Sequence, residues 1–354
     1  MTQKVIYNLL AILNINKSLN INENEMINII NQKTILVTGG GGSIGSFLCE
    51  KLIEYNPKEI IIFDIYENSS YMVYQNLMIK KQKMNLTTTI KVIIGSVYLK
   101  SNIKEIFKNN EIDYVFHTAA YKHVPLMEEV PIQAINTNCI GTYNVAYYCN
   151  KYKVKKMVLI STDKAINPLN VMGASKKIAE DIVLNFSKSS SCCKYSIVRF
   201  GNVFNSNGSL IPILLNQLDK KCDLTITHKD ATRYFISISD AISLILYTLS
   251  FDDNNVMYVL DMGKQIKIQQ LAEELIKQYN MIPYKDVKIN YIGLRKGEKI
   301  VEEILDYNNM LKTKDKHIYA MPCGYTKSNE EILDFLKKCK KSKNIKNDIL
   351  NFVK

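Results

Sequence analysis

The chain has 354 residues, enough to bury a full hydrophobic core, and its 47% apolar and 23% charged residues describe a globular protein. Its net charge of +12 comes from scattered basic residues without interleaved aromatic side chains, so we expect no nucleic-acid partner. No segment approaches the roughly 18 apolar residues of a membrane helix, and the eight cysteines form no CxxC pair. We therefore expect a cytoplasmic protein with reduced thiols, no membrane insertion and no metal site.

Arginine is rare in this chain. Of 46 basic residues only three are arginine, namely Arg199, Arg233 and Arg295. A guanidinium can form two parallel hydrogen bonds to a phosphate, which an ammonium cannot. These positions are therefore candidates for binding a diphosphate, unless they carry arginine by chance.

Residues 1–33 form an Asn- and Ile-rich extension with helical spacing and no recognisable chemistry. We expect this extension to pack on the outside of the domain that follows.

A short apolar strand, residues 34–38, leads into a glycine-rich turn, and a helix follows the turn. Five of the 14 glycines lie within residues 39–45. Strand, glycine turn and helix together are typical of a dinucleotide site, because the backbone can approach the pyrophosphate at the helix N-terminus. The candidate cofactor residues in this turn are Gly39, Gly42, Ser43, Ile44 and Gly45.

The next strand, residues 59–63, ends at Asp64, 19 residues after Gly45. This spacing is typical of an acidic residue that binds the adenosine ribose hydroxyls. No arginine lies nearby to bind a 2′-phosphate, so the sequence favours NAD over NADP.

Two further strands, residues 91–94 and 114–117, are followed by small residues that suit a backbone close to a cofactor. These residues are Ser96, Val97, Ala119 and Ala120. Strands alternate with helices as far as residue 200, so the sequence predicts an α/β fold with a doubly wound parallel (Rossmann) sheet.

Residues 156–180, KMVLISTDKAINPLNVMGASKKIAE, form the central stretch of the chain. A buried strand ends near Ser161, Asp163 and Lys164 follow it, and a helix begins near Met172. Ligands of open α/β sheets bind at the carboxyl ends of the strands. The sequence therefore predicts that acid–base chemistry takes place here.

After the strand at 195–199 the regular alternation ends, and short strands and polar loops predict a smaller, interleaved substrate-binding lobe. We assign residues 34–200, with a return segment at about 236–265, to the dinucleotide-binding domain. Residues 201–235 and 266–312 are assigned to the lobe, with a final helix near Glu302 and Glu303. Residues 313–354 are a Lys-rich tail with one helical segment, 329–338, which we expect to be a solvated surface.

Seven segments resemble the UDP-N-acetylglucosamine 4,6-dehydratases, the polysaccharide-biosynthesis branch of the extended short-chain dehydrogenases. They are TILVTGGGGSIGS, VFHTAAYKHVPLMEEVP, TNCIGTYNVA, VLISTDKAINPLNVMGASKKIAE, VRFGNVFNSNGSLIP, ATRYFISI and GLRKGEKIVEE, within residues 30–310. The resemblance implies hydride transfer from the sugar C4 to NAD, deprotonation at C5, loss of water from C6 and return of the hydride to C6.

The resemblance also implies roles for the central residues. Lys164 is then the base at C5, Asp163 the acid at C6, and Thr162 the contact to the C4 oxygen. Lys176 holds the nicotinamide ribose. We expect burial and the neighbouring Lys176 to lower the pKa of Lys164, and burial to raise that of Asp163.

The substrate, UDP-N-acetylglucosamine, is expected to contact residues in the remaining motifs. These candidates are Lys122, His123, Arg199, Asn202, Ser209, Arg233, Arg295 and Glu298.

Two positions depart from the usual pattern. Met172 stands where ordinary short-chain dehydrogenases have a tyrosine that accepts the C4-hydroxyl proton, and a thioether cannot accept it. We expect Asp163 to accept that proton, directly or through water. Ser96 replaces an aspartate, so a contact on the adenine side is weakened.

Two other functions remain open. A UDP-hexose 4-epimerase would return the hydride to C4 and need no acid at C6, and a silent NAD- and nucleotide-sugar-binding protein would explain the missing tyrosine. The outcome at C5, retention or inversion, is also open. We expect a homodimer or larger homo-oligomer, paired through helices near residues 100–110 and 133–150.

Overall fold

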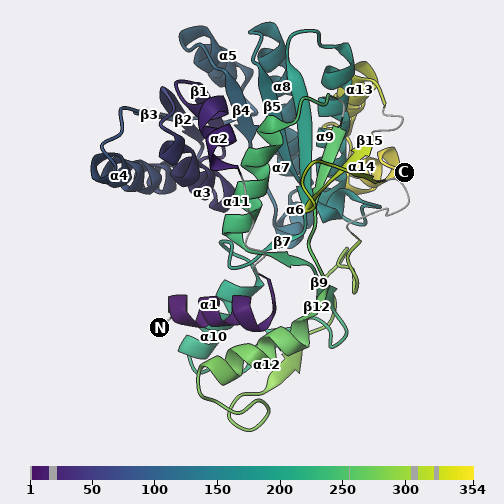
Figure 1. The fold of residues 1–354 in the computed structure, drawn as a ribbon. Helices are drawn as coiled ribbons and strands as arrows, with labels where there is room; N and C mark the ends of the chain where they lie inside the picture. Colours follow the sequence, from purple (N-terminus) through teal and green to yellow (C-terminus); the bar gives the residue numbers. More distant parts are fainter. Residues whose placement is uncertain (1, 16–21, 255, 304–309, 323–326) are drawn as a thin grey trace.

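The structure is a computed structural model that describes residues 2–15, 22–254, 256–303, 310–322 and 327–354. Across these residues the main sheet has nine strands (Figure 1). In order across the sheet they are β14 (Leu311–Lys312), β15 (Ile318–Pro322), β11 (Val256–Leu260), β6 (Lys194–Phe200), β5 (Lys156–Thr162), β4 (Tyr114–His117), β1 (Thr34–Thr38), β2 (Glu59–Asp64) and β3 (Thr89–Ile94).

The seven strands from β11 to β3 are all parallel. The order of the sheet reverses between β1 and β4, so the chain winds outward in both directions from this point. The doubly wound parallel sheet expected from the sequence is thus confirmed, with strand ends within about two residues of those expected. Its carboxyl edge beside β1 and β4 is where such sheets bind ligands.

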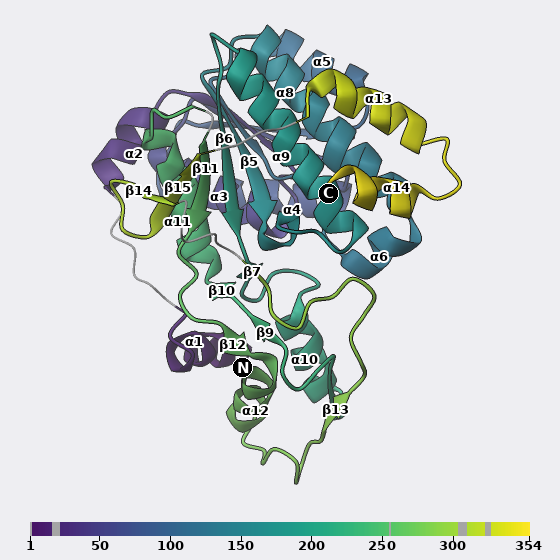
Figure 2. The same cartoon turned by 90° about the vertical axis from the view of Figure 1, so that its right-hand side faces the viewer.

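Helices cover both faces of the sheet, because strands buried on both sides need an apolar layer on each (Figures 1 and 2). One face is covered by α2 (Glu23–Ile30), α3 (Ser43–Leu52), α4 (Glu67–Lys83) and α11 (Ile238–Tyr247). The other is covered by α5 (Lys100–Asn109), α6 (Val124–Glu129), α7 (Pro131–Ala134), the π-helix η2 (Ile135–Gly141), α8 (Thr142–Lys151) and α9 (Val171–Ser189). Three short 3₁₀ turns are η1 (Ile53–Tyr55), η3 (Asp163–Ala165) and η4 (Thr248–Ser250).

A smaller lobe lies beyond the carboxyl edge of the sheet, in the lower part of Figure 1. Its elements are β7 (Asn202–Val203), α10 (Leu210–Asp219), β8 (Leu224–Ile226), β9 (Thr232–Arg233), β10 (Phe235–Ile236), β12 (Ile266–Lys267), α12 (Ile268–Gln278) and β13 (Ile289–Tyr291). The lobe has its own apolar core, and α11 and β11 return the chain from it to the main sheet. The cleft between lobe and sheet therefore lies over the strand ends.

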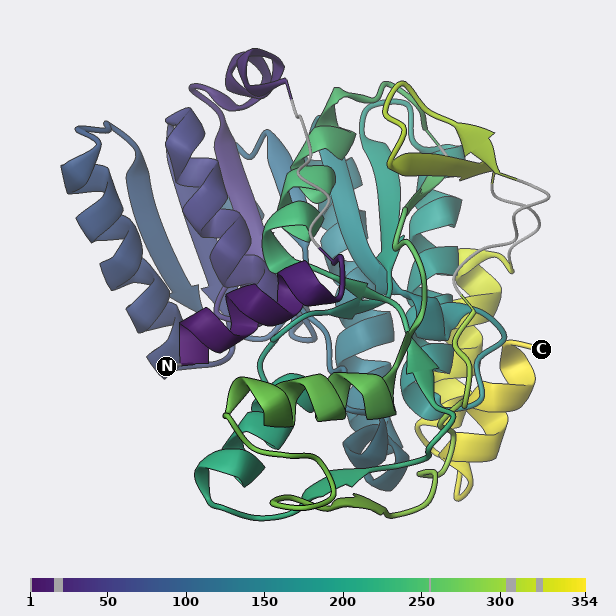
Figure 3. The same ribbon diagram turned by 60° about the horizontal axis from the view of Figure 1, so that its bottom comes forward.

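The N-terminal extension packs against both parts of the molecule. Helix α1 (Thr2–Ile12) lies along α12, where Val5 and Leu9 are buried in the core of the lobe (Figure 3). Helix α2 instead buries Met26 and Ile30 against the main domain. Helices α1 and α2 of the extension therefore contribute to the two hydrophobic cores rather than only covering the outside.

The C-terminal segment is not the solvated surface expected from its lysines. Strand β15 pairs antiparallel with β11, and β14 pairs with β15. Helices α13 (Asn329–Cys339) and α14 (Ile345–Phe352) pack on α9 and bury Ile332, Leu336 and Ile349 in the main core. Lys337 and Lys338 occupy the exposed face of the amphipathic helix α13, which explains why composition alone was misleading.

The helix expected near Glu302 is not observed in the described part of that segment. Residues 302 and 303 are irregular, Val301 forms an isolated bridge to Thr232, and residues 304–309 lie outside the described ranges. In the parts of the chain that the structure describes, no helix combines the length and apolar character needed to span a bilayer.

If α13 is part of the main core, Leu336→Ala should lower the free energy of unfolding by about 2–4 kcal/mol, because it leaves a cavity against α9. Lys337→Ala, on the exposed face of the same helix, should change it by less than about 0.5 kcal/mol. Urea unfolding of both variants tests this. Equal, small effects would contradict a core role for α13.

Candidate active site

The glycine turn after β1 lines a cavity that suits a dinucleotide. Gly39 has a φ of +71°, and a Cβ there would lie 2.5 Å from the backbone nitrogen of Ala119. A Cβ on Gly45 would lie 2.2 Å from the carbonyl oxygen of Gly39. Only glycine fits both positions, so the backbone and the N-terminus of α3 remain open to a phosphate.

Asp64 lies at the end of β2, beside this turn. Its carboxylate accepts hydrogen bonds from the backbone nitrogens of Gly41 and Tyr66, each at 2.9 Å, and is thereby held at the cavity. Among the described residues that line the cavity, none is lysine or arginine. The predicted cofactor residues Gly39, Gly42, Asp64, Ser96, Val97, Ala119 and Ala120 all line it.

Ser43, Ile44 and Gly45 lie in the first turn of α3 but do not line this cavity. The Ser43 hydroxyl accepts a hydrogen bond from the Asn207 backbone nitrogen at 3.0 Å. The Lys122 ammonium donates to the Asn207 carbonyl at 2.7 Å. These two contacts join the glycine turn and the loop after β4 to the smaller lobe.

The central stretch folds into a strand end, a single turn and a capped helix. Strand β5 ends at Thr162, and Asp163 and Lys164 occupy the 3₁₀ turn η3. The Asn170 side chain caps α9 by accepting from the Gly173 nitrogen at 2.8 Å. A Cβ on Gly173 would lie 2.2 Å from the Lys164 carbonyl oxygen, so glycine is needed for α9 to pack against the turn.

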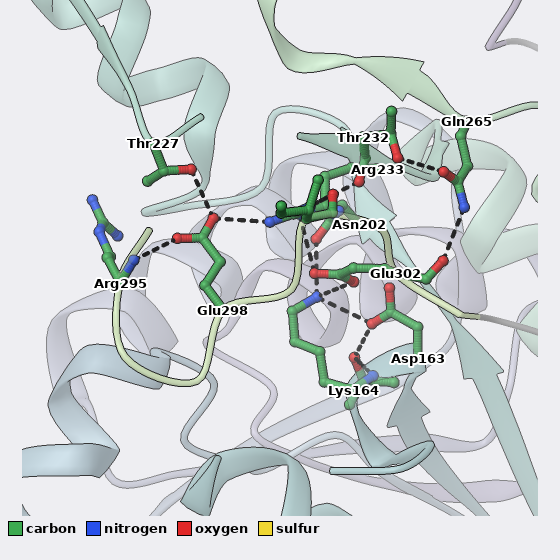
Figure 4. Close-up of polar contacts among 12 residues, drawn as sticks. Asp163, Lys164, Asn202, Thr227, Thr232, Arg233, Gln265, Arg295, Glu298 and Glu302 are labelled. Atoms are coloured by element: carbon green, nitrogen blue, oxygen red, sulfur yellow. Dashed lines mark hydrogen bonds and ion pairs between the residues drawn. The ribbon is translucent and has the colours of Figure 1, made fainter. Parts of the chain in front are cut away.

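Five polar side chains meet at this turn, and Figure 4 labels four of them, Asp163, Lys164, Asn202 and Glu302. The Lys164 Nζ lies 3.1 Å from Asp163 Oδ1 and 2.8 Å from Glu302 Oε2, and donates to Asn202 Oδ1 at 3.4 Å. The Thr162 hydroxyl donates to Asp163 Oδ1 at 2.8 Å. Asp163 and Glu302 are 2% and 5% exposed, so two carboxylates share one cation in a site with little water.

Glu302 is the main residue of this cluster that the sequence did not single out as a site residue. It is 138 positions from Lys164 in the chain, and only the folding of the lobe segment over the strand ends brings the two together. The available signal was its place in the GEKIVEE segment, four residues after Glu298. The Gln265 amide donates to the Glu302 carbonyl at 2.9 Å and helps to hold the backbone.

The charges of the cluster correct the expected protonation of Lys164 and Asp163. Burial by itself lowers the pKa of Lys164, but the carboxylates of Asp163 and Glu302 outweigh this effect and raise the pKa above its ordinary value. Burial raises the pKa of Asp163, but the charge of Lys164 and the hydrogen bond from Thr162 help to bring it below its ordinary value. Lys176 does not lower the pKa of Lys164, because the carboxylates are the near partners.

The pKa of Glu302, in contrast, lies above its ordinary value. Burial raises its pKa to about 7; the charges of Lys164 and Arg233 oppose this shift, and the negative charge of Asp163 adds to it. Of the two carboxyl groups, Glu302 is therefore the one that is protonated first as the pH falls.

Lys176 and Met172 lie on the face of α9 that packs against β5. The Lys176 Nζ donates to the Ile160 carbonyl at 2.6 Å, and burial lowers its pKa to about 8. Met172 is buried in the apolar core, at 3% exposure, and neither residue lines the cleft or the cofactor cavity.

The three arginines have different environments. Arg233, on β9, contacts Glu298 at 2.8 Å and Glu302 at 3.1 Å, and lines the cleft together with Arg295. Arg199 does not reach the cleft. Its guanidinium forms a buried bidentate pair with Glu180 of α9, at 3.0 and 2.6 Å, which corrects its expected contact with a substrate.

Most of the remaining candidate substrate-binding residues line the cleft between the end of β5 and the smaller lobe. Lys122, His123, Asn202 and Glu298 line it, and the backbone nitrogen of Arg295 and the hydroxyl of Thr227 donate to Glu298. Ser209 does not line the cleft and instead occupies the N-cap position of α10.

Comparison with known proteins shows the family of the chain. The family model described as "Polysaccharide biosynthesis protein" matches residues 35–322. The chain belongs to this family. CapD, the capsular polysaccharide biosynthesis protein of Staphylococcus aureus, is 42% identical over 281 residues, which are 79% of this chain and 46% of CapD.

Two further proteins extend the comparison of this family member. A protein named UDP-glucose 4-epimerase from Rickettsia bellii is 35% identical over 296 residues, covering 82% of this chain and 83% of that protein. The X-ray structure of Pen from Bacillus thuringiensis matches with a TM-score of 0.76 and 29% identity, covering 85% and 90% of the two chains. The chain spans about half the length of CapD. The matched relatives carry different names, so the comparison gives the family and does not decide the reaction.

The charge state of Glu302 predicts how stability depends on pH. Its pKa is 4.5 in the unfolded chain and about 7 in the fold, so its stabilising contribution is complete below pH 4.5 and is lost as the pH rises through about 7. Glu302→Gln removes this loss. The unfolding temperature of the variant minus that of the wild type should therefore increase between pH 4.5 and about 7.

Thermal unfolding at a series of pH values measures this difference. The exposed neighbour Glu303→Gln serves as the control and should change the unfolding temperature little at any pH. A flat or decreasing difference for Glu302→Gln would show that Glu302 titrates normally.

Proposed function

We propose that the protein catalyses the NAD-dependent 4,6-dehydration of UDP-N-acetylglucosamine to a UDP-4-keto-6-deoxy sugar. The observation that carries the proposal is the Asp163–Lys164 pair, which lies at the end of β5 in a cleft that also contains Arg233 and Arg295. An acid and a base next to each other suit removal of a C5 proton and departure of a C6 hydroxyl. Membership of the polysaccharide biosynthesis family supports a nucleotide sugar as substrate.

The cofactor in this proposal is NAD, held by the glycine turn with its pyrophosphate at the N-terminus of α3 and its ribose at Asp64. The absence of cationic side chains among the described lining residues favours NAD over NADP. When bound, NAD supplies hydride acceptance and return. Ser96, which replaces an aspartate, offers only a hydroxyl on the adenine side.

The substrate in this proposal lies with its diphosphate beside Arg233 and Arg295, the two arginines of the cleft, and Arg233 keeps its contacts to Glu298 and Glu302. Asn202 is within reach of the same cleft and of Lys164. Lys122, His123 and Glu298 complete the lining toward the uridine and sugar.

The roles of the reacting residues follow from a balance of protons. The C4 hydroxyl loses a proton when its hydride leaves, and the C6 hydroxyl gains one when it departs as water. The Thr162 hydroxyl donates to Asp163 at 2.8 Å, so the pair can carry the C4 proton to Asp163 without a tyrosine at position 172. Asp163 then protonates the C6 oxygen, while Lys164 removes the C5 proton and later returns a proton there.

A 4-epimerase is the second candidate, favoured by the relative named UDP-glucose 4-epimerase. Such an enzyme would interconvert UDP-hexoses without forming a methyl group. The Asp163–Lys164 pair favours dehydration, because returning the hydride to C4 requires no acid at C6. A catalytically silent binding protein would convert neither UDP-N-acetylglucosamine nor a UDP-hexose.

The two reactions give different products by NMR. We expect protein incubated with UDP-N-acetylglucosamine in deuterated water, without added NAD, to form a C6 methyl group with deuterium at C5. Ring couplings then distinguish retention from inversion at C5. Epimerised hexose without a methyl group would support the epimerase, and unchanged UDP-N-acetylglucosamine and UDP-glucose, even with NAD added, would contradict both enzymes.

The dehydratase proposal also predicts the effect of removing the acid and the base. Asp163→Asn and Lys164→Met should each lower kcat by roughly 10²–10⁴-fold, the usual contribution of a general acid or base. The matched controls are Asp181→Asn and Lys177→Met, which break a 2.7 Å ion pair on α9 outside the cleft and should retain activity. Full activity of Asp163→Asn would exclude its role as the acid.

A further inference from the structure

Lys164 presents a problem for the proposed reaction. A base at C5 must be uncharged, yet Lys164 contacts two carboxylates, Asp163 at 3.1 Å and Glu302 at 2.8 Å. Both favour the ammonium form of the side chain. If Lys164 stays charged throughout the cycle, it cannot remove a proton from carbon.

We propose that Glu302 accepts the Nζ proton of Lys164 during each turnover, which frees Lys164 to act as the base, and returns that proton when the product is complete. The proposal rests on the dehydratase function above and adds a second carboxyl group to its machinery. Glu302 acts on the reaction through Lys164, so it is a positioning and proton-holding residue.

The contacts of Glu302 suit this role. Its Oε1 is anchored by Arg233 Nε at 3.1 Å, which leaves Oε2 facing the Lys164 Nζ at 2.8 Å (Figure 4). Arg233 is itself held by Glu298 and by the carbonyls of Thr232 and Ile300. The acceptor is thus aligned on the donor before a substrate binds.

The surroundings also decide which carboxyl group receives the proton. Among the described residues, Asp163 and Lys164 from η3 and Arg233 from β9 are the charged groups that shift the pKa of Glu302, and Glu298, Lys299 and Glu303 line the same cleft. Burial raises the pKa of Glu302 to about 7, whereas the pKa of Asp163 lies below its ordinary value. Glu302 can therefore hold a proton near neutral pH while Asp163 remains ready to accept the one from the C4 hydroxyl.

The protons balance over one turnover. In the active form, which prevails above about pH 7, Lys164 is charged and both carboxyl groups are ionised at the start. Oxidation at C4 passes its hydroxyl proton through Thr162 to Asp163, and Lys164 passes its Nζ proton to Glu302. Neutral Lys164 takes the C5 proton while Asp163 gives its proton to the departing C6 oxygen, which leaves as water.

The second half of the cycle restores the site. The hydride returns to C6, charged Lys164 gives a proton to C5, and Glu302 returns the stored proton to Lys164. The net change is substrate to keto sugar plus water, and the protein ends with the protons it started with.

The test compares wild type with Glu302→Gln, which keeps the shape of the side chain but accepts no proton as a base. We expect kcat to fall by about 100-fold or more. The isotope effect on kcat should rise for substrate deuterated at C5 and should not rise for substrate deuterated at C4. A merely structural loss would not shift the rate limit specifically to C5.

The pH profile provides a second readout. In the wild type Glu302 must be ionised to accept a proton, so kcat should be lost as the pH falls through about 7. This limb should disappear in Glu302→Gln and persist, at reduced kcat, in Glu302→Asp. Infrared difference spectra of the protein without ligands should contain a protonated carboxyl band near neutral pH that Glu302→Gln lacks.

Glu54→Gln is the matched control, because Glu54 also pairs with two lysines, Lys51 and Lys80, but outside the cleft. It should retain the kcat and the pH profile of the wild type. If the wild type produces no keto sugar, the proposed function fails. If the wild type is active and Glu302→Gln has the same kcat, C5 isotope effect and pH limb, only the role of Glu302 is overturned.

If Glu302→Gln fails to fold, the pH profile of Glu302→Asp tests the proposal instead, because the loss of kcat at low pH should persist in that variant. Loss of that limb in an active, folded Glu302→Asp protein would overturn the proposal.

Discussion

The balance of charge around Lys164 is the constraint on which the rest of the site depends. Asp163 belongs to the end of β5 and Glu302 to the segment that crosses back from the lobe, so their shared cation joins the two parts of the molecule. Arg233 extends the same network into the lobe through Glu298 and Glu302. Buried charges are costly unless they are paired, so this network restricts how the lobe can sit over the strand ends.

The helix α9 connects this network to the main sheet. Asn170 caps it, Gly173 allows its first turn to touch the turn η3, and Lys176 donates to β5. Farther along, Glu180 holds Arg199 in the core, and α13 and α14 pack on its outer side. The C-terminal residues therefore support the helix that positions the site, although they are far from the cleft in sequence.

The structure also changes how the missing tyrosine is understood. Met172 is buried in the core and does not line the cleft, so its side chain contributes to core packing. Asp163, Lys164 and Glu302 form a contacting group of acid–base side chains in the cleft. Three groups that exchange protons can, in our proposal, replace the single phenol of ordinary short-chain dehydrogenases.

The sequence by itself determined the doubly wound sheet, the glycine turn and the strand-end location of Asp163 and Lys164, because periodicity and turn chemistry are local properties of the chain. It did not reveal the buried pairing of Arg199 with Glu180, the core role of the C-terminal helices or the meeting of Glu302 with Lys164. These depend on which faces become buried and which distant segments meet. The expected direction of the pKa shift of Lys164 was wrong for the same reason, because a pKa is set by neighbours that only the tertiary structure provides.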